Sequence, residues 1–217
     1  MTLPSATLFP QALLPLFIFE PRYRRMLHDA LESDRLFAVA MQKPGRLRDA
    51  PFPVAGLGLI RASVQHEDQT SHLILQGVAR VQLGPAIQYK PYRVHQIQPL
   101  AASGTDPVAL QPLLKELYEK VGQGLEKGLA ATLGQSIPSD RESKEGPLPV
   151  FSIQEIIKHL QQMRGPEEVT DLVAAALVLD PEQRQRILET LDVSQRLRHL
   201  IFCLTAQANG ASPKNES

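Results

Sequence analysis

Hydrophobic and polar positions divide the chain into a strand-rich first half and a helix-rich second half. In the first hundred residues the apolar segments are short and are bounded by Gly, Pro or polar clusters, a pattern typical of β-strands. The longest of them is expected to break or bend at Gly77. About six strands and one helix are predicted, which favours a compact barrel over a parallel α/β sheet. The predicted strands lie in five segments, the fourth of which would be divided at Gly77: residues 14–19, 36–42, 54–64, 72–84 and 89–100.

The stretch LLPLFIFEPRYRRMLHDAL (13–31) combines the first strand with the single early helix. Its apolar run has no Lys or Arg before Arg22 and is too short to span a bilayer, so it lacks the features of a signal peptide or a membrane anchor. We therefore interpret LPLFIF as a buried strand that leads into a helix beginning at Pro21, where the missing N–H of proline costs nothing. The face of this helix that should be buried consists of Tyr23, Met26, Leu27, Ala30 and Leu31.

Glycines support two further predictions. Gly56 and Gly58 lie two residues apart in one strand, which indicates a bulge or a close crossing of strands. GQGLEKG (122–128) lacks the spacing of a phosphate-binding loop and lies beside a helical pattern. It is therefore expected to be the end of a helix or a bend in one.

Most of the second half has the helical period. Ser152 and Glu155 form a capping-box pattern, and the polar segment 136–149 is expected to be a mobile loop. Helix starts are predicted at Asp106-Pro107, Ser152, Pro166, Asp180-Pro181 and Asp192. The expected organisation is a β-barrel subdomain at 1–105, an α-helical subdomain at 106–207 and a flexible tail at 208–217.

Composition narrows the class of protein. The 217 residues include 23 Lys and Arg and 23 Asp and Glu, and this zero net charge argues against a nucleic-acid binder. Cys203 is the single cysteine, so no intrachain disulfide can form and a reducing, cytoplasmic location is expected. No membrane association is predicted.

No residue is assigned a catalytic, cofactor-binding or metal-binding role. Cys203 is expected to be a buried, small apolar residue. His199 lies four residues earlier on the same helical face, but no third group or oxyanion motif supports a catalytic thiolate. His66, Glu67, Asp68 and His72 are expected to form a solvated turn rather than a metal site.

Three arginines surround Tyr23 at positions 22, 24 and 25. In isolation such a patch could contact RNA or an acidic partner. A solvated helix face is the favoured interpretation, because the chain has no surplus of positive charge.

The order of these motifs resembles the N-terminal substrate-binding domain of the Lon-type ATP-dependent proteases. The resemblance is carried by LPLFIFEPRYRRML (14–27), LFAVAMQ (36–42), AGLGLI (55–60), GVARVQL (77–83) and PYRVHQIQPL (91–100), and again by the helical segment 172–197. The chain departs from the family where Asp68 is followed by Gln69 in place of Gly, which changes the expected turn type. A second departure is Leu57, where the family often has Thr.

The resemblance implies an α+β fold: a six-stranded PUA-like pseudo-barrel with one inserted helix, followed by a C-terminal helical bundle. The chain contains neither the ATPase nor the peptidase module, so it is similar to stand-alone bacterial proteins of this family and is expected not to be an enzyme. The implied function is binding of a protein or an unfolded polypeptide, with an adaptor role in protein quality control; the alternative is an RNA-binding protein.

Two binding modes stay open at this stage: a groove between barrel and helices, or an exposed strand edge that pairs with an extended peptide. The family signature is Glu20, Pro21, Arg22 and Tyr23. These four residues are expected to be structural, at a junction that fixes the helix on the barrel.

Overall fold

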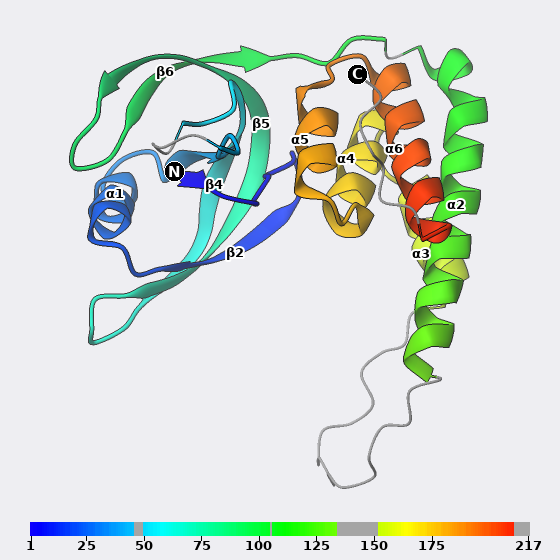
Figure 1. The fold of residues 1–217 in the computed structure, drawn as a ribbon, viewed down its shortest axis with the longest axis horizontal. Coiled ribbons are helices and arrows are strands. Elements are labelled where there is room, and N and C mark those ends of the chain that lie inside the picture. Colours follow the sequence, from blue (N-terminus) through cyan, green and yellow to red (C-terminus); the bar gives the residue numbers. More distant parts are fainter. Residues whose placement is uncertain (46–49, 105, 134–151, 211–217) are drawn as a thin grey trace, which may run out of the picture.

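The computed structural model describes residues 1–45, 50–104, 106–133 and 152–210, without the side chains of 127–133. Within these residues the fold is α+β, with a six-stranded sheet and six helices. Figure 1 shows the sheet on one side of the molecule and α2 to α6 on the other, with α1 at the end of the sheet away from them. The predicted loop 136–149 and most of the predicted tail lie outside the described residues.

The sheet is organised around one long strand, β5. The strand order is β1-β3-β4-β5-β2, and β6 also pairs with β5. All neighbours are antiparallel except β1 and β3, which are parallel. The first half of β5 pairs with β2 and its second half with β6. The strands are β1 Thr2–Leu3, β2 Leu13–Ile18, β3 Leu36–Met41, β4 Val54–Gln65, β5 Ser71–Gln88 and β6 Val94–Leu100.

Three strands differ from what the sequence predicted. The short β1 was not predicted, since two residues carry no period. β5 does not end at Gly84 but continues through Pro85 to Gln88, because the pairing with β6 shifts register around this proline and a bulge tolerates its missing N–H. β6 begins at Val94 rather than at residue 89.

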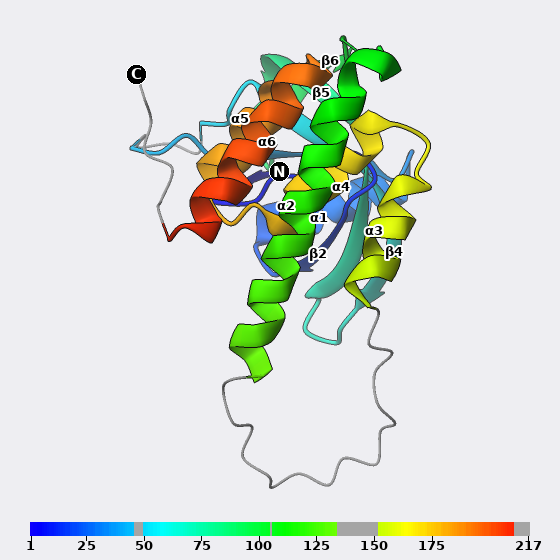
Figure 2. The same cartoon turned by 90° about the vertical axis from the view of Figure 1, so that its right-hand side faces the viewer.

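The helices begin where the capping signals predicted. Ser152 and Glu155 form both hydrogen bonds of a capping box, and the side chains of Asp180 and Asp192 accept bonds from the first turns of α5 and α6. The expectation of a helix end at 122–128 is wrong, since α2 runs through this segment to Leu133. The helices are α1 Pro21–Leu31, α2 Pro107–Leu133, α3 Ile153–Gln161, α4 Pro166–Leu177, α5 Pro181–Glu189 and α6 Val193–Ala208. Figure 2 shows α2, α3 and α6 in front of the sheet.

α1 buries the face that its sequence predicted, with one exception. Tyr23, Met26, Leu27 and Ala30 are buried. Leu31 was expected in this set but remains 38% exposed. It is the last residue of the helix, where the chain already turns away toward β3.

A short segment ahead of β2 belongs to both hydrophobic cores. Phe9 packs in the core of the helices, whereas Leu8 packs in the core between the sheet and α1. The segment crosses β4 and β5 so closely that a Cβ on Gly77 would lie 1.9 Å from the Phe9 oxygen, and one on Gly56 2.0 Å from the Leu8 oxygen. The close crossing predicted from the glycines is therefore present, although its partner is this segment rather than another strand.

Candidate functional site

The signature residues lie at the start of α1 and hold it against β1. Pro21 is the first residue of the helix, and the Glu20 carboxylate accepts a hydrogen bond from Arg22 Nε at 2.8 Å. The buried Tyr23 hydroxyl donates to the Thr2 carbonyl at 2.9 Å and accepts from the Thr2 amide at 3.2 Å. The Arg22 guanidinium lies over the Tyr23 ring, 4.5 Å from its centroid.

The other two arginines of the basic patch have local partners. Arg25 forms an ion pair with Asp29 at 3.0 Å, and Arg24 donates to the Asp68 carbonyl at 3.3 Å. Asp29 also accepts a bond from the Tyr92 hydroxyl at 2.7 Å, which holds the pKa of Asp29 below its ordinary value. The patch is thus tied by Arg24 to the β4–β5 turn.

The environment of Cys203 is that of a buried thiol. Cys203 Sγ and His199 Nε2 both approach Gln183 Oε1, at 3.8 and 2.8 Å. Burial raises the pKa of Cys203 to about 11, with a further contribution from Asp180. A nucleophilic cysteine needs the opposite shift, because the thiolate is the reactive form. Burial lowers the pKa of His199, which is half-buried.

A buried ionic network joins the sheet to the helices. Arg80 extends from β5, and its two terminal nitrogens donate hydrogen bonds to the two carboxylate oxygens of Asp171 on α4. The same carboxylate accepts a bond from Arg196 of α6 at 3.1 Å. All three side chains are at most 5% exposed. Burial and the nearby Arg80 lower the pKa of Arg196.

Backbone carbonyls complete the network. Arg80 Nε donates to the Leu188 oxygen at 3.0 Å, and Arg196 Nε donates to the Thr190 oxygen at 2.9 Å. Gln185 of α5 adds a bond to the Val54 oxygen of β4 at 2.9 Å. We call Arg80, Asp171, Gln185 and Arg196 the joint. Because it links β4 and β5 to three helices, the joint fixes the helices on the sheet.

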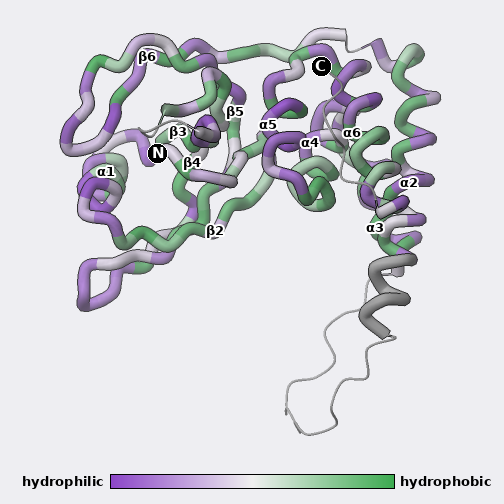
Figure 3. The backbone as a smooth tube through the Cα atoms, in the orientation of Figure 1, coloured by the Kyte–Doolittle hydropathy of each residue, from purple (hydrophilic) through white to green (hydrophobic). Residues whose placement is uncertain are grey.

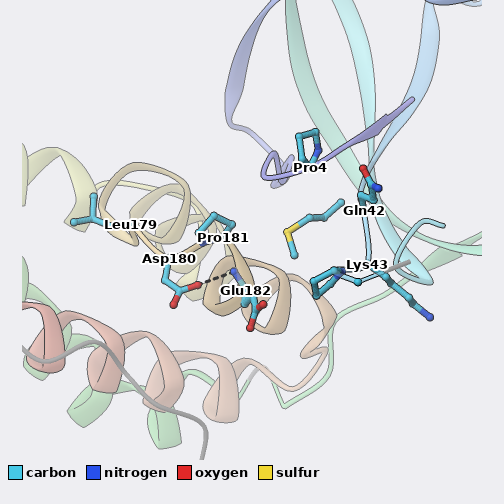
Figure 4. Close-up of a pocket in the computed structure, with 10 residues that line it drawn as sticks. Pro4, Gln42, Lys43, Leu179, Asp180, Pro181 and Glu182 are labelled. Carbon is cyan, nitrogen blue, oxygen red and sulfur yellow. Dashed lines mark hydrogen bonds between the residues drawn. The ribbon is translucent and has the colours of Figure 1, made fainter. Parts of the chain in front are cut away.

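A groove opens between the sheet and the helices. It has a volume of about 850 Å³. Figure 4 shows Pro4, Gln42 and Lys43 on the sheet side and Leu179 to Glu182 on the helix side. Asp180 is engaged in capping α5 through the Glu182 amide at 2.8 Å. The lining mixes charged and apolar groups and offers no continuous apolar surface.

A continuous apolar surface lies on β2, β4 and β5. Cross-strand pairing places Pro15 beside Ile74 and Phe17 beside His72, and the next strand adds Ala62 and Val64. A groove of about 430 Å³ runs over this surface. None of its residues carries a permanent charge, and Figure 3 shows the hydrophobic stretch along β2. We call the following exposed residues the outer face: Leu13, Pro15, Phe17, Phe19, Ala62, Val64, His66, His72 and Ile74.

Four rings form a row along the outer face. Phe19 stacks on Phe17 at 5.9 Å between centroids, and Phe17 lies 4.7 Å from His72. The row continues to His66, whose ring meets His72 edge-on at 5.0 Å. Phe17 and Phe19 remain 48% and 59% exposed. Large, rigid rings at the surface are typical of sites that bind a partner.

The turn between β4 and β5 fixes the histidine end of this row. Asp68 accepts bonds from the amide and the hydroxyl of Thr70 at 3.0 and 2.7 Å, and these bonds lower the pKa of Asp68. Gln69 adopts φ +65°, the conformation that a glycine in the family turn would favour. His66 and His72 share a hydrogen bond of 2.7 Å. Among the described residues, a grouping of three side chains that could hold a metal ion occurs at His28, Asp29 and Glu32, not in this turn.

Sequence reasoning missed the outer face. It treated LPLFIF as a wholly buried strand, whereas Leu14, Leu16 and Ile18 face the core and Leu13, Pro15 and Phe17 face outward. The available signal was an apolar run without polar alternation in a strand that contains proline. Proline is confined mainly to edge strands, so this strand was a candidate for exposure.

An α+β fold that exposes an uncharged face with a row of rings has the surface features of a protein-binding module. More specifically, the chain belongs to the family of the ATP-dependent protease La (LON) substrate-binding domain, whose model matches residues 1–206. Among curated relatives, the Lon protease of Dictyoglomus thermophilum is 23% identical over 95% of this chain and 24% of its own length. That of Roseiflexus castenholzii is 28% identical over 94% and 23%. The chain thus spans about a quarter of these relatives.

Solved structures show the same fold. The N-terminal domain of the Mycobacterium avium complex Lon protease has a TM-score of 0.68 at 19% identity, covering 94% of this chain and 96% of that one. The Lon N-terminal domain protein from Xanthomonas campestris has a TM-score of 0.60 at 17% identity, with coverage of 93% and 95%. In the described part of the chain, no helix is both long and apolar enough to cross a membrane.

Proposed function

We propose that the outer face binds apolar segments of unfolded polypeptides. The observation that carries the proposal is the row of exposed rings on a surface without permanent charge. An unfolded chain exposes the apolar and aromatic side chains that such a face can cover, and it does not require a deep pocket. The family's description as a substrate-binding domain supports a polypeptide as the occupant.

We propose binding on the face rather than along the free edge of β2. This strand lies at the end of the strand order, but Pro15 in its centre has no N–H to donate. Proline in an edge strand hinders the addition of a further strand. The groove of Figure 4 is a weaker candidate, because Lys43, Asp180 and Glu182 line it.

We assign the signature Glu20, Pro21, Arg22 and Tyr23 a structural role. Glu20 accepts a bond from Arg22, Arg22 lies over the Tyr23 ring, and Tyr23 is hydrogen-bonded to Thr2. These bonds position α1 against β1. α1 therefore packs on the core side of the sheet, away from the outward-facing residues of β2.

The proposal is tested by titrating the protein with a fluorescent, permanently unfolded polypeptide. Phe17→Ser should weaken binding by about tenfold, because a single aromatic anchor contributes roughly 1–2 kcal/mol. The matched control is Phe202→Ser on α6, which removes a ring that is 58% exposed outside the outer face. Equal effects of the two substitutions, or no effect of Phe17→Ser, would refute the proposed site.

A single-stranded RNA of equal length belongs in the same experiment. The RNA-binding alternative rests on analogy with PUA-type barrels, and the residues of the outer face include no Lys or Arg to contact phosphates. Polypeptide binding should change little with salt. RNA binding through phosphate contacts would instead be strongly salt-dependent.

We infer that the sheet and α1 form the expected PUA-like pseudo-barrel, which the pairing of β5 with three strands supports. We also infer that α2 to α6 form the expected helical bundle.

The finer part of the proposal is an adaptor role in protein quality control. In this role the chain would capture an unfolded polypeptide and present it to a separate ATP-dependent protease. Addition of the protein to a purified Lon protease should then accelerate degradation of the fluorescent polypeptide. Phe17→Ser should abolish the acceleration, and an unchanged or slower rate with the wild-type protein would reject this role.

A further inference from the structure

A pair of histidines closes one end of the outer face. His66 Nε2 lies 2.7 Å from His72 Nδ1. Two imidazole nitrogens can approach this closely only when one carries a proton and the other offers a lone pair. The hydrogen bond between the two rings therefore persists when both rings are neutral. It also persists when the donor ring carries one additional proton. With both rings fully protonated the hydrogen bond is lost and two like charges oppose each other.

His66 and His72 are the two ionisable residues of the outer face. His72 packs on Phe17 of β2 and lies opposite Val64 of β4, neither of which carries charge. In the turn, Asp68 interacts electrostatically with His66, and Glu67 is its neighbour in sequence. Arg24 of α1 reaches the Asp68 carbonyl from the other side. The Asp68 carboxylate is already hydrogen-bonded to Thr70.

We propose that the His66–His72 pair sets the charge selectivity of the outer face. This inference rests on the proposed polypeptide-binding function. When the pair is neutral, the face takes uncharged apolar segments. When the pair is protonated, the face favours apolar segments flanked by Asp or Glu and binds uncharged ones less well. The cause is that positive charge at one end of an apolar groove attracts carboxylates and must be desolvated by a neutral ligand.

Two fluorescent peptides with the same aromatic core test this inference, one flanked by Ser and one by Glu. Their affinities are measured at about pH 8 and about pH 5.5, because histidine is the side chain that generally changes charge between pH 5 and pH 8. The ratio of affinities, Glu peptide over Ser peptide, should rise about tenfold on acidification at low salt. His66→Gln combined with His72→Gln should abolish the rise. His159→Gln, at an exposed histidine on α3, should retain it.

Each outcome is decisive. A ratio that does not change with pH in the wild-type protein, while both peptides bind, would overturn the selectivity role alone. A rise that persists in the double variant would also overturn it. Failure of both peptides to bind at either pH would instead overturn the proposed function on which the inference rests. Thermal unfolding of the double variant, with both substitutions at exposed positions, checks that it folds.

Discussion

The joint buries charge, whereas the outer face exposes rings. Arg80, Asp171 and Arg196 lie out of water between sheet and helices, yet every nitrogen of the two guanidiniums and both oxygens of the Asp171 carboxylate form hydrogen bonds. Phe17 and Phe19 are 48% and 59% exposed, and their rings stack on each other at the surface. Both regions invert the usual distribution of residue types. The difference teaches that completed bonds mark a structural site, whereas unfilled apolar surface marks a site for a partner.

The largest effect is expected when the joint loses its carboxylate. Asp171→Asn removes the charge that both guanidiniums share and should lower the free energy of unfolding by about 3–5 kcal/mol, since it leaves buried cations uncompensated. Urea denaturation measures the change. Glu20→Gln, at the exposed pair with Arg22, is the control and should cost less than about 1 kcal/mol. Similar losses for both variants would show that the joint is no more than a surface ion pair.

A smaller effect is expected where the segment with Phe9 crosses the strands. Gly77→Ala would place a Cβ 1.9 Å from the Phe9 oxygen, so the backbone must shift and the stability should fall by roughly 2–3 kcal/mol. Gly124→Ala is the matched control, since α2 leaves open space around that position. It should stabilise the protein by about 0.5–1 kcal/mol, because alanine is the better helix former. Thermal melts of the two variants should therefore shift in opposite directions.

Alkaline pH should reveal the buried thiol in the helical core. The pKa of Cys203 is about 11 in the folded protein and near 9 when unfolded, so its contribution to stability is fully present below pH 9 and is lost as the pH rises toward 11. Cys203→Ala should lose less stability than the wild type between pH 8 and pH 10.5.

Thiol labelling tests the same burial. At pH 7.5 a thiol reagent should label the native protein slowly and the urea-unfolded protein at once. Rapid labelling of the native protein would contradict the burial of this thiol.

The smallest effect on stability is expected on the outer face. Phe17→Ser should change the free energy of unfolding by only about 0.5 kcal/mol, as surface substitutions usually do, even though it should weaken polypeptide binding about tenfold. Denaturation of the same samples used for the titration separates the two quantities. A large loss of stability would show that Phe17, like the residues of the joint, mainly stabilises the fold.

Much of the fold could be predicted because its signals are local. The cap residues Ser152, Asp180 and Asp192 mark helix starts within the first turn, and the period of Tyr23, Met26 and Leu27 marks the buried face of α1. The continuation of β5 past Pro85 could not be predicted in this way. It depends on a register shift against β6 that the sequence of either strand alone does not show.

The site was less predictable because its residues meet only in the folded protein. Phe17 and His72, whose ring centroids lie 4.7 Å apart, are 55 positions apart in sequence. The outer face depends on which side of β2 is left uncovered, and a fully apolar strand has the same pattern on both sides. The family resemblance indicated a binding role, but not the surface that performs it.

The central claim is tested most directly by mapping the contact in solution. Methyl resonances of Ile74 and Val64 are followed by NMR while an unfolded polypeptide is added. The account predicts that these two shift, together with Leu13, whereas Ile187 in the helical core and Leu179 beside the groove of Figure 4 stay in place. Shifts confined to Leu179 and its neighbours, with Ile74 and Val64 unchanged, would contradict the claim that the outer face is the binding site.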